Sequence, residues 1–200
     1  MKSFFAVLLS FLVCFGTSAN ANANAASNLT QILSTLPDGG YIMDMGVDAN
    51  GLFAVTDLDG NPVPGSPFTI DLNSVPPPGP ANGTSINTKD QWGCTAPNEW
   101  VDWDSWKAAG GELAFWCSAG NVVPKKKVLS WTYNGNMAYI CNYAGDQNCD
   151  GNEYWNYMQT IADQCSFTGC GWFLQGSGDK SYGRGLKKGL SDPYYICYNT

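Results

Sequence analysis

The feature that most constrains this sequence is the position of its cysteines. Of the eight in the chain, seven lie after residue 93, at Cys94, Cys117, Cys141, Cys149, Cys165, Cys170 and Cys197. No two are spaced as Cys-x-x-Cys, the usual spacing of ligands in structural zinc sites, so we expect disulfides and no metal. Disulfides stabilise small domains by restricting the unfolded chain. The cysteines therefore predict a compact, disulfide-stapled domain over about residues 90–200.

Helix geometry limits which cysteines can pair. A helix expected over residues 151–164 would be about 21 Å long at about 1.5 Å per residue, whereas bridged Cα atoms lie within about 7 Å of each other. Cys149 and Cys165, at its two ends, therefore cannot bond to each other. A bond between Cys141 and Cys149 is feasible across a loop.

Seven is an odd number, so one thiol is left over or pairs between chains. Bonds from Cys117, Cys165 and Cys197 to neighbouring strands would join layers of the fold and stabilise it more. Cys170 follows closely after Cys165 and is the weakest candidate. We therefore expect the bridged residues to be Cys94, Cys117, Cys141, Cys149, Cys165 and Cys197, with Cys170 left over.

The beginning of the chain predicts an export signal. Lys2 precedes a run from Phe4 to Phe15 that is apolar except for one serine. This is the length of the apolar part of a signal peptide and too short to span a bilayer. Small residues then alternate with asparagine over residues 19–23, which favours cleavage between residues 21 and 25. We expect residues 1–21 to be a signal peptide and the protein to be secreted and extracellular, with no stable membrane insertion.

Charge and composition exclude several classes of function. The chain carries a net charge of -7, and removal of Lys2 with the signal makes it -8. An acidic protein is repelled by nucleic acid, which is therefore not an expected partner. The chain has no histidine, which removes Ser-His-Asp and Cys-His nucleophiles and imidazole metal sites. We expect no cofactor.

The chain divides into two parts at a proline-rich linker. Residues 26–74 contain no cysteine, tryptophan, lysine or arginine and form an acidic, β-rich N-terminal segment. Its short strand-like runs, separated by turn residues, are Tyr41 to Val47, Leu52 to Thr56 and Phe68 to Leu72. Residues 75–89 are rich in proline and glycine and are predicted to be a linker. The cysteine-rich domain follows at residues 90–200.

The second part predicts an α+β fold, a compact αββαβ sandwich. In order, the expected elements are a helix over Asp102 to Cys117, strands over Lys127 to Tyr133 and Asn136 to Tyr143, a helix from Gly151 to about Gln164, and strands over Gly171 to Gln175 and Tyr194 to Tyr198. Asn134-Gly135 is a typical hairpin turn between the first two strands. Asp150 is expected to cap the second helix. Gly110-Gly111 is expected to kink or split the first helix.

Two short motifs match the acceptor for N-linked glycans. They are Asn28-Leu29-Thr30 and Asn82-Gly83-Thr84, in a terminal segment and in the linker. In a eukaryotic host they predict a glycoprotein modified at Asn28 or Asn82. The alternative is an ordinary asparagine in a turn.

All eight tryptophans lie between residues 92 and 172, which suggests a binding surface. Trp92, Trp100 and Trp103 lie near Asn98 and Asp102, and exposed aromatic rings beside polar groups can stack on a glycan. The alternative is that these rings pack in the core, as aromatic residues at helical spacing usually do.

Two further sets of residues bear on catalysis and on metal binding. Four carboxylates, Asp102, Asp104, Glu112 and Glu153, offer pairs for glycoside hydrolysis, although acidic residues are common on any acidic surface. Residues 146–151 match the first half of a calcium loop, but its twelfth position is Tyr157 instead of glutamate. We therefore expect neither a metal site nor an enzyme, with a carboxylate-based glycosidase as the alternative.

Several cysteine-centred and aromatic motifs occur after residue 90. They are Trp116-Cys117, Met137 to Tyr143, Cys149, Glu153, Cys165, Gly171-Trp172, Ser181-Tyr182-Gly183-Arg184 and Tyr195-Ile196-Cys197. This set resembles small secreted cysteine-rich proteins of filamentous fungi and related plant-associated microbes. The order of elements is similar to killer-toxin-like proteins and to small fungal lectins. The resemblance covers slightly over half of the chain and adds Tyr182 and Arg184 to the expected binding residues.

The resemblance implies an effector or elicitor, a virulence protein that acts in the extracellular space of a host. Its expected partner is a host cell-surface or apoplastic protein or glycan. Two alternatives remain open at this point. One is a lectin-like module that binds glycans through exposed tryptophan and tyrosine, and the other is a membrane-active protein related to killer toxins.

Overall fold

The computed structural model describes residues 34–45, 48–69, 90–95, 99–177, 179–187 and 197. The expected signal peptide, both glycosylation motifs and the linker lie outside these residues. Of the strand expected over Tyr194 to Tyr198, only Cys197 is described.

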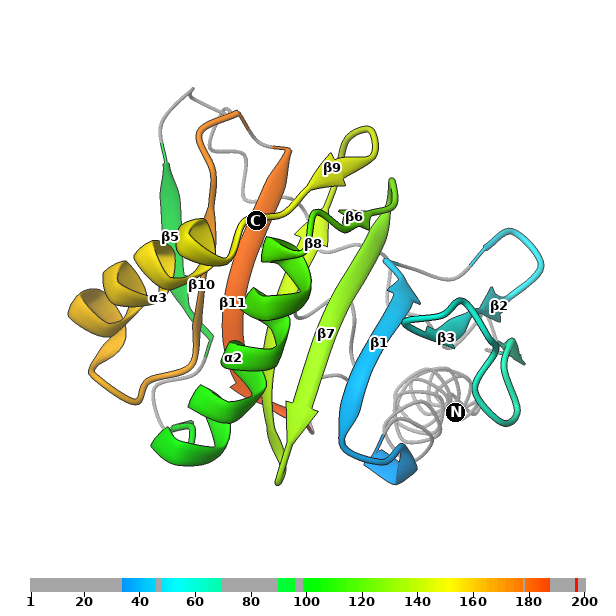
Figure 1. Cartoon of the computed structure of the whole chain (residues 1–200), viewed down its shortest axis with the longest axis horizontal. Coiled ribbons are helices and arrows are strands. Elements are labelled where there is room, and N and C mark those ends of the chain that lie inside the picture. Colours follow the sequence, from blue (N-terminus) through cyan, green and yellow to red (C-terminus); the bar gives the residue numbers. More distant parts are fainter. Residues whose placement is uncertain are drawn as a thin grey trace, which may run out of the picture.

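The described residues form an α+β fold, as expected, and it is built on a seven-stranded antiparallel sheet. From one edge to the other the strands are β3 (Val55–Asp57), β1 (Gly39–Asp44), β7 (Lys127–Tyr133), β8 (Asn136–Asn142), β11 (Lys180–Leu186), β10 (Gly171–Leu174) and β5 (Gln91–Cys94). Two small two-stranded sheets pair β2 (Leu52–Phe53) with β4 (Phe68–Thr69) and β6 (Val122–Val123) with β9 (Gln147–Asn148). Helices α2 (Trp103–Ser118) and α3 (Gly151–Cys165) lie side by side on one face of the large sheet (Figure 1).

Local signals account for the helices and for the central hairpin. The Asp102 side chain accepts a hydrogen bond from the Ser105 amide and begins α2, and Asp150 begins α3 by accepting from the Asn152 and Glu153 amides. Asn134 and Gly135 both have positive φ, 45° and 77°, as a type I′ hairpin turn requires. The strands that flank this turn begin and end within one residue of their expected limits.

The expected kink at Gly110-Gly111 is wrong, because α2 runs continuously through both glycines. Gly110 faces α3, where a Cβ atom would lie 3.1 Å from the rings of Tyr154 and Trp155. The glycine therefore allows the two helices to approach. Packing against α3 outweighs the low helix propensity of glycine at this position.

The N-terminal segment joins the same sheet as the cysteine-rich part. Strand β1 pairs with β7 over six residue pairs, from Gly39 opposite Thr132 to Asp44 opposite Lys127. An ion pair between the Lys127 ammonium and the Asp44 carboxylate joins the ends of these strands. Strand β3 then pairs with the outer edge of β1. The sheet is therefore wider than the αββαβ unit alone.

Strands β5 and β11 were not expected from the sequence, since each contains glycine, which is depleted in strands. A Cβ at Gly183 of β11 would overlap the ring of Tyr139 on the neighbouring strand β8. A Cβ at Gly93 of β5 would lie 2.7 Å from the indole of Trp172 on β10. In both cases a large ring lies across a glycine on the next strand, so the glycines are required by packing.

The sheet has an apolar core on each face. The core between the sheet and the helices contains, among others, Trp106, Leu113, Leu129, Ile140, Tyr154, Met158, Ile161 and Tyr182. The core on the opposite face is built by β1, the segment that follows it, β7 and β8, with Met43, Phe53, Val55, Val128, Met137 and Tyr139. The central strand β8 is therefore covered on both faces, which explains why every one of its residues is buried.

Three disulfides join distant parts of this fold and use the six cysteines that were expected to be bridged. They are Cys94–Cys165, Cys117–Cys149 and Cys141–Cys197, with Cα separations of 5.4, 4.9 and 5.8 Å. The loops that they close span 71, 32 and 56 residues. In the chain-entropy model each bridge lowers the entropy of the unfolded chain and so stabilises the folded state by about 4 kcal/mol. Such bridges are typical of extracellular and other oxidising compartments.

The pairing agrees with the helix-length argument and corrects one alternative. Cys149 and Cys165 are bonded to other partners, as the length of α3 requires. The feasible bond between Cys141 and Cys149 does not form, because Cys149 is bonded to the end of α2 and Cys141 to Cys197. Cys170 lies outside the three bridges and is buried. No helix in the described part of the chain is both long and apolar enough to cross a membrane.

Candidate binding surface

A chain of aromatic rings runs between the two helices, from the core to the surface. Phe167 stacks on Trp103 with ring centroids 4.1 Å apart, and Trp103 lies 5.0 Å from Trp106. Trp155 continues the chain, with its ring 5.6 Å from Trp106 and 5.2 Å from the buried ring of Tyr154. We call these five residues the aromatic ladder. It joins side chains of α2 and α3 to Phe167, which follows α3.

The inner end of the ladder is buried because the helices approach closely there. Gly151, the first residue of α3, faces α2, where a Cβ would lie 2.6 Å from the Ala114 carbonyl oxygen. The Trp106 indole donates a hydrogen bond to the Tyr154 hydroxyl at 3.1 Å. Burial raises the pKa of Tyr154 above its ordinary range. This end of the ladder is therefore a structural core, and only its outer end can meet a partner.

Arg184 supports the ladder from below and is not on the surface. Its guanidinium carbon lies 4.7 Å from the Trp106 ring centroid. Nε donates to the Gly169 carbonyl at 2.8 Å and Nη2 donates to the Ser166 carbonyl at 3.1 Å. Ser166 is the C-cap of α3, so the cation lies at the negative end of the helix dipole. Burial lowers the pKa of the guanidinium.

Tyr182 is also buried, in a polar network around Glu153. The Tyr182 hydroxyl donates to Glu153, whose carboxylate also accepts from the Lys180 ammonium at 2.9 Å and from the Gln175 amide at 2.9 Å. Burial, followed by the nearby Glu153 carboxylate, raises the pKa of Tyr182. The structure therefore places Tyr182 and Arg184 inside the fold. Neither presents the exposed side chain that a binding role at the surface requires.

The candidate carboxylates have structural positions. Asp102 caps α2, and the hydrogen bonds that it accepts from Ser105 lower its pKa. Glu153 is held by the network described above. Asp104 and Glu112 are eight residues apart on one helix, about 12 Å along its axis, which exceeds the separations of about 5–9.5 Å used in glycoside hydrolysis.

The calcium-like residues likewise bond to backbone amides. Asp146 accepts from the Lys125 amide at 2.8 Å, and Asp150 accepts from two amides at the start of α3. Over the described ranges, no group of three or more acidic, cysteine or histidine side chains is arranged to hold a metal ion. The carboxylate oxygens of Asp146 and Asp150 therefore accept hydrogen bonds from a loop amide and from the first turn of α3.

The outer end of the ladder is an exposed aromatic surface. The side chain of Phe167 is 59% exposed, and that of Trp100 is 55% exposed. Trp103 lies beneath Phe167 and is half-buried. We call Trp100, Trp103 and Phe167 the aromatic platform. It brings together two of the three tryptophans expected at a binding surface and adds a phenylalanine.

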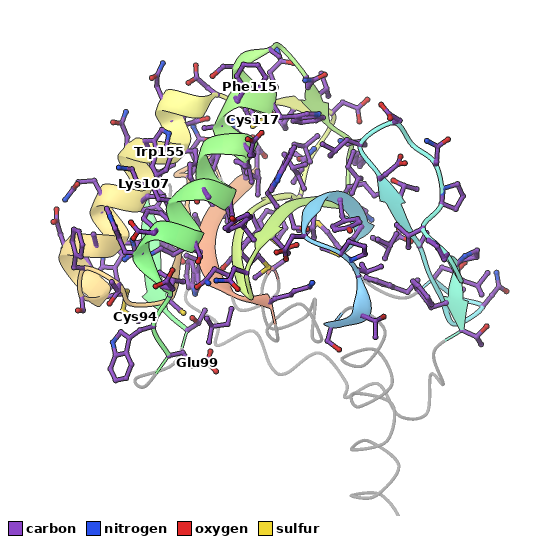
Figure 2. The ribbon with its side chains drawn as sticks, turned by 60° about the horizontal axis from the view of Figure 1, so that its bottom comes forward. Cys94, Glu99, Lys107, Phe115, Cys117 and Trp155 are labelled. Atoms are coloured by element: carbon purple, nitrogen blue, oxygen red, sulfur yellow. A yellow bond between two sulfur atoms is a disulfide. The ribbon has the colours of Figure 1, made fainter. Side chains whose placement is uncertain are left out.

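Backbone pairing holds the two segments of the platform together. Trp100 forms a β-bridge with Gly169, the Val101 amide donates to the Thr168 carbonyl at 2.9 Å, and the Cys170 amide donates to the Glu99 carbonyl at 3.2 Å. The disulfide between Cys94 and Cys165 joins the same two segments. Figure 2 shows Cys94 and Glu99 together at one end of the molecule, away from Phe115 and Cys117 at the other end of α2.

Trp92, the third expected binding residue, is exposed at a separate position. It lies on β5 at the sheet edge, opposite Phe173 of β10, and is 47% exposed. It precedes Cys94 by two residues, which places it about 7 Å farther along the strand. Its backbone pairs with β10, whereas the backbone of Trp100 pairs with Gly169 in the turn that carries Phe167.

Phe167 was missed by sequence reasoning because it belongs to no periodic apolar pattern. It lies in the turn Ser166-Phe167-Thr168-Gly169 between α3 and β10. Its neighbours are polar or small, so the useful signal was a single aromatic residue within a turn. Such a residue has no core face to fill, and exposure is the expected result.

No protein family, curated protein or solved structure matches this chain. Its function is therefore inferred from its own residues, and the aromatic platform is the described feature best suited to contact a partner.

Proposed function

We propose that this protein is a secreted effector or elicitor that binds a host component outside the cell through the aromatic platform. The observation that carries the proposal is the pair of half-exposed aromatic side chains, Trp100 and Phe167, on two backbone segments that are bonded to each other. Two exposed rings on paired segments offer apolar area that a partner can cover, and tryptophan is enriched among the residues that contribute most to binding. The export signal expected at residues 1–21 supports the part of the proposal that concerns secretion.

The surroundings of the platform favour binding over catalysis. The backbone bonds and the Cys94–Cys165 bridge restrict both segments before any partner arrives. A rigid surface loses little conformational entropy on association, so more of the contact energy remains as affinity. The three disulfides would keep this surface intact in an oxidising extracellular space.

The test is infiltration of the protein into plant leaf tissue. The full chain is expressed in a secreting host, recovered from the medium with its disulfides intact, and compared with a Trp100→Ala/Phe167→Ala variant. We expect the unmodified protein to trigger an oxidative burst or cell death, and the variant to need at least about tenfold more protein for the same response, as loss of one binding hot spot requires.

A matched control separates the platform from exposed aromatics in general. Phe115 is 75% exposed at the opposite end of α2, so Phe115→Ala should leave the response unchanged. Near-ultraviolet circular dichroism would establish that all variants are folded. An unmodified protein that is inert in leaves in both native and reduced forms would overturn the proposal.

A further inference from the structure

We infer that the ligand of the aromatic platform is an uncharged polysaccharide of pyranose sugars, of the kind found in cell walls. The inference rests on the proposed function, because it names the chemistry of the component that the platform binds.

Most of the exposed large apolar side chains are aromatic. In the described part of the chain the exposed large hydrophobic residues are Trp92, Trp100, Phe115, Val122, Tyr133 and Phe167, of which five are aromatic. A surface that contacts lipid chains would also be expected to expose leucine, isoleucine or methionine. The face of an aromatic ring is electron-rich and attracts the electron-poor C–H groups on the flat face of a pyranose.

Charge around the platform disfavours an acidic glycan. Glu99 immediately precedes Trp100, and Asp102 and Asp104 flank Trp103, while Lys107 lies one turn farther along α2, so the surroundings are acidic on balance. The whole chain is also acidic, at -7. Polyanions such as pectate or sulfated glycans would be repelled. Exposed carboxylates such as Asp104 can instead accept hydrogen bonds from the hydroxyl groups of a neutral sugar.

The turn that presents Phe167 is strained, and the fold maintains the strain. Ser166 has φ 74° and ψ 155°, a region that is otherwise adopted almost entirely by glycine. Its carbonyl accepts hydrogen bonds from buried Arg184 and from the Gly169 amide at 3.0 Å. Strain of this type costs about 1–3 kcal/mol and tends to occur at functional sites. Here it places a phenylalanine beside Trp103 with more than half of its side chain in solvent.

The stacking within the platform leaves surfaces free for a sugar chain. Trp103 is covered on one side by Phe167 and packs against Trp106 on the inside. Trp100 and the outer part of Phe167 remain open. We therefore expect these two residues to carry the sugar contacts, with Trp103 as their support.

The experiment measures binding of cellohexaose, laminarihexaose and chitohexaose by isothermal titration calorimetry and by tryptophan fluorescence. Polygalacturonate serves as the charged comparison. We expect at least one neutral hexasaccharide to bind and polygalacturonate not to bind. Trp100→Ala and Phe167→Ala should each weaken binding by at least about tenfold, while Phe115→Ala should leave it unchanged.

Other results would overturn the inference and identify what covers the platform. Binding to phosphatidylcholine vesicles without binding to any hexasaccharide would assign the platform to a membrane. A dimer in analytical ultracentrifugation that is lost in Trp100→Ala would assign it to a second copy of this chain. Hexasaccharide binding that survives in the double variant would place the site elsewhere.

The outcome is separable from that of the proposed function. If no hexasaccharide binds but leaves still respond to the protein through the platform, the sugar inference fails and the effector proposal stands. If a hexasaccharide binds through the platform and leaves do not respond, the sugar inference stands and the effector proposal fails.

Discussion

Arg184 lies beneath Trp106, with its guanidinium carbon 4.7 Å from the ring centroid, and its hydrogen bonds go to the carbonyls of Ser166 and Gly169. The described residues contain no ion pair to this buried cation. A single side chain thus joins the end of α3, the turn that carries Phe167 and the centre of the aromatic ladder. This relationship makes the exposed platform dependent on the buried core.

The first prediction concerns this cation. Arg184→Lys should lower the free energy of unfolding by about 2–4 kcal/mol, because lysine cannot donate to both carbonyls in one plane or stack in the same way on the indole. Urea denaturation followed by fluorescence measures the change. Lys107→Met, which removes an exposed cation from α2, should change stability by less than about 0.5 kcal/mol. Equal effects of the two substitutions would contradict the structural role of Arg184.

The second prediction concerns the order in which the disulfides are reduced. Cys94 is exposed, whereas both cysteines of each of the other two bridges are buried. Because reduction requires access of a thiolate to sulfur, the Cys94–Cys165 bond should open first. Alkylation and mass spectrometry over increasing reductant would detect labelling of these two residues before Cys117 or Cys141. Earlier labelling of either buried bridge would contradict the prediction.

The third prediction follows from two glycines with different surroundings. Gly183→Ala should destabilise the protein by about 2 kcal/mol or more, because the added methyl group would overlap the ring of Tyr139. Gly111→Ala should stabilise it by about 0.5–1 kcal/mol, because Gly111 lies inside α2 with open space beside it. Thermal or urea unfolding of the two variants checks both signs. A Gly183→Ala protein as stable as the parent would show that β11 does not lie against Tyr139 in this register.

The fourth prediction concerns alkaline pH. Burial, followed by the nearby Glu153 carboxylate, raises the pKa of Tyr157 to about 12, against about 10 in an unfolded chain. A raised pKa means that the folded state favours the neutral phenol, so this stabilisation is complete below about pH 10 and is lost as the pH rises towards 12. The free energy of unfolding should therefore fall less steeply over this window in Tyr157→Phe. Parallel pH profiles would contradict the assignment.

The fifth prediction concerns acidic pH. Hydrogen bonds from Ser105 lower the pKa of Asp102, so its contribution is present above about pH 4 and is lost as the pH falls through the lowered value. Asp102→Asn should be less stable than the parent near neutral pH, and the difference should shrink in acid. Denaturant titrations at a series of pH values measure this convergence. A constant difference at all pH values would show that the charge on Asp102 does not contribute.

Elements with local causes were predictable from the sequence. The Asn134-Gly135 turn brings together strands that are adjacent in the chain, so its residues alone specify the hairpin. The start of α2 was also expected near Asp102, although the capping role of Asp102 was not. Asp150 bonds to amides within three residues, so the cap of α3 could be predicted from its neighbours alone. The same holds for the exclusion of a bond between Cys149 and Cys165, which depends only on the length of the helix between them.

Elements with distant causes were not predictable in this way. In strand β11, Gly183 leaves room for the ring of Tyr139, which is 44 residues earlier in the chain. Strand β1 completes the sheet by pairing with β7, more than 80 residues later. The platform likewise needs Trp100 opposite Gly169. A pattern of residues close together in the sequence does not indicate which distant residues will lie beside them.

The sequence by itself determined the cap of α3, the central turn, the positions of the two helices and the six cysteines that form bridges, because each of these depends on residues close together in the chain or on cysteine chemistry. Only the tertiary structure decided that Tyr182 and Arg184 are buried, that Trp100 and Phe167 share one exposed end, and which cysteines are bonded to each other. These outcomes depend on which side chains meet after strands distant in sequence have paired. The pairing is favoured because it buries apolar side chains on both faces of the sheet.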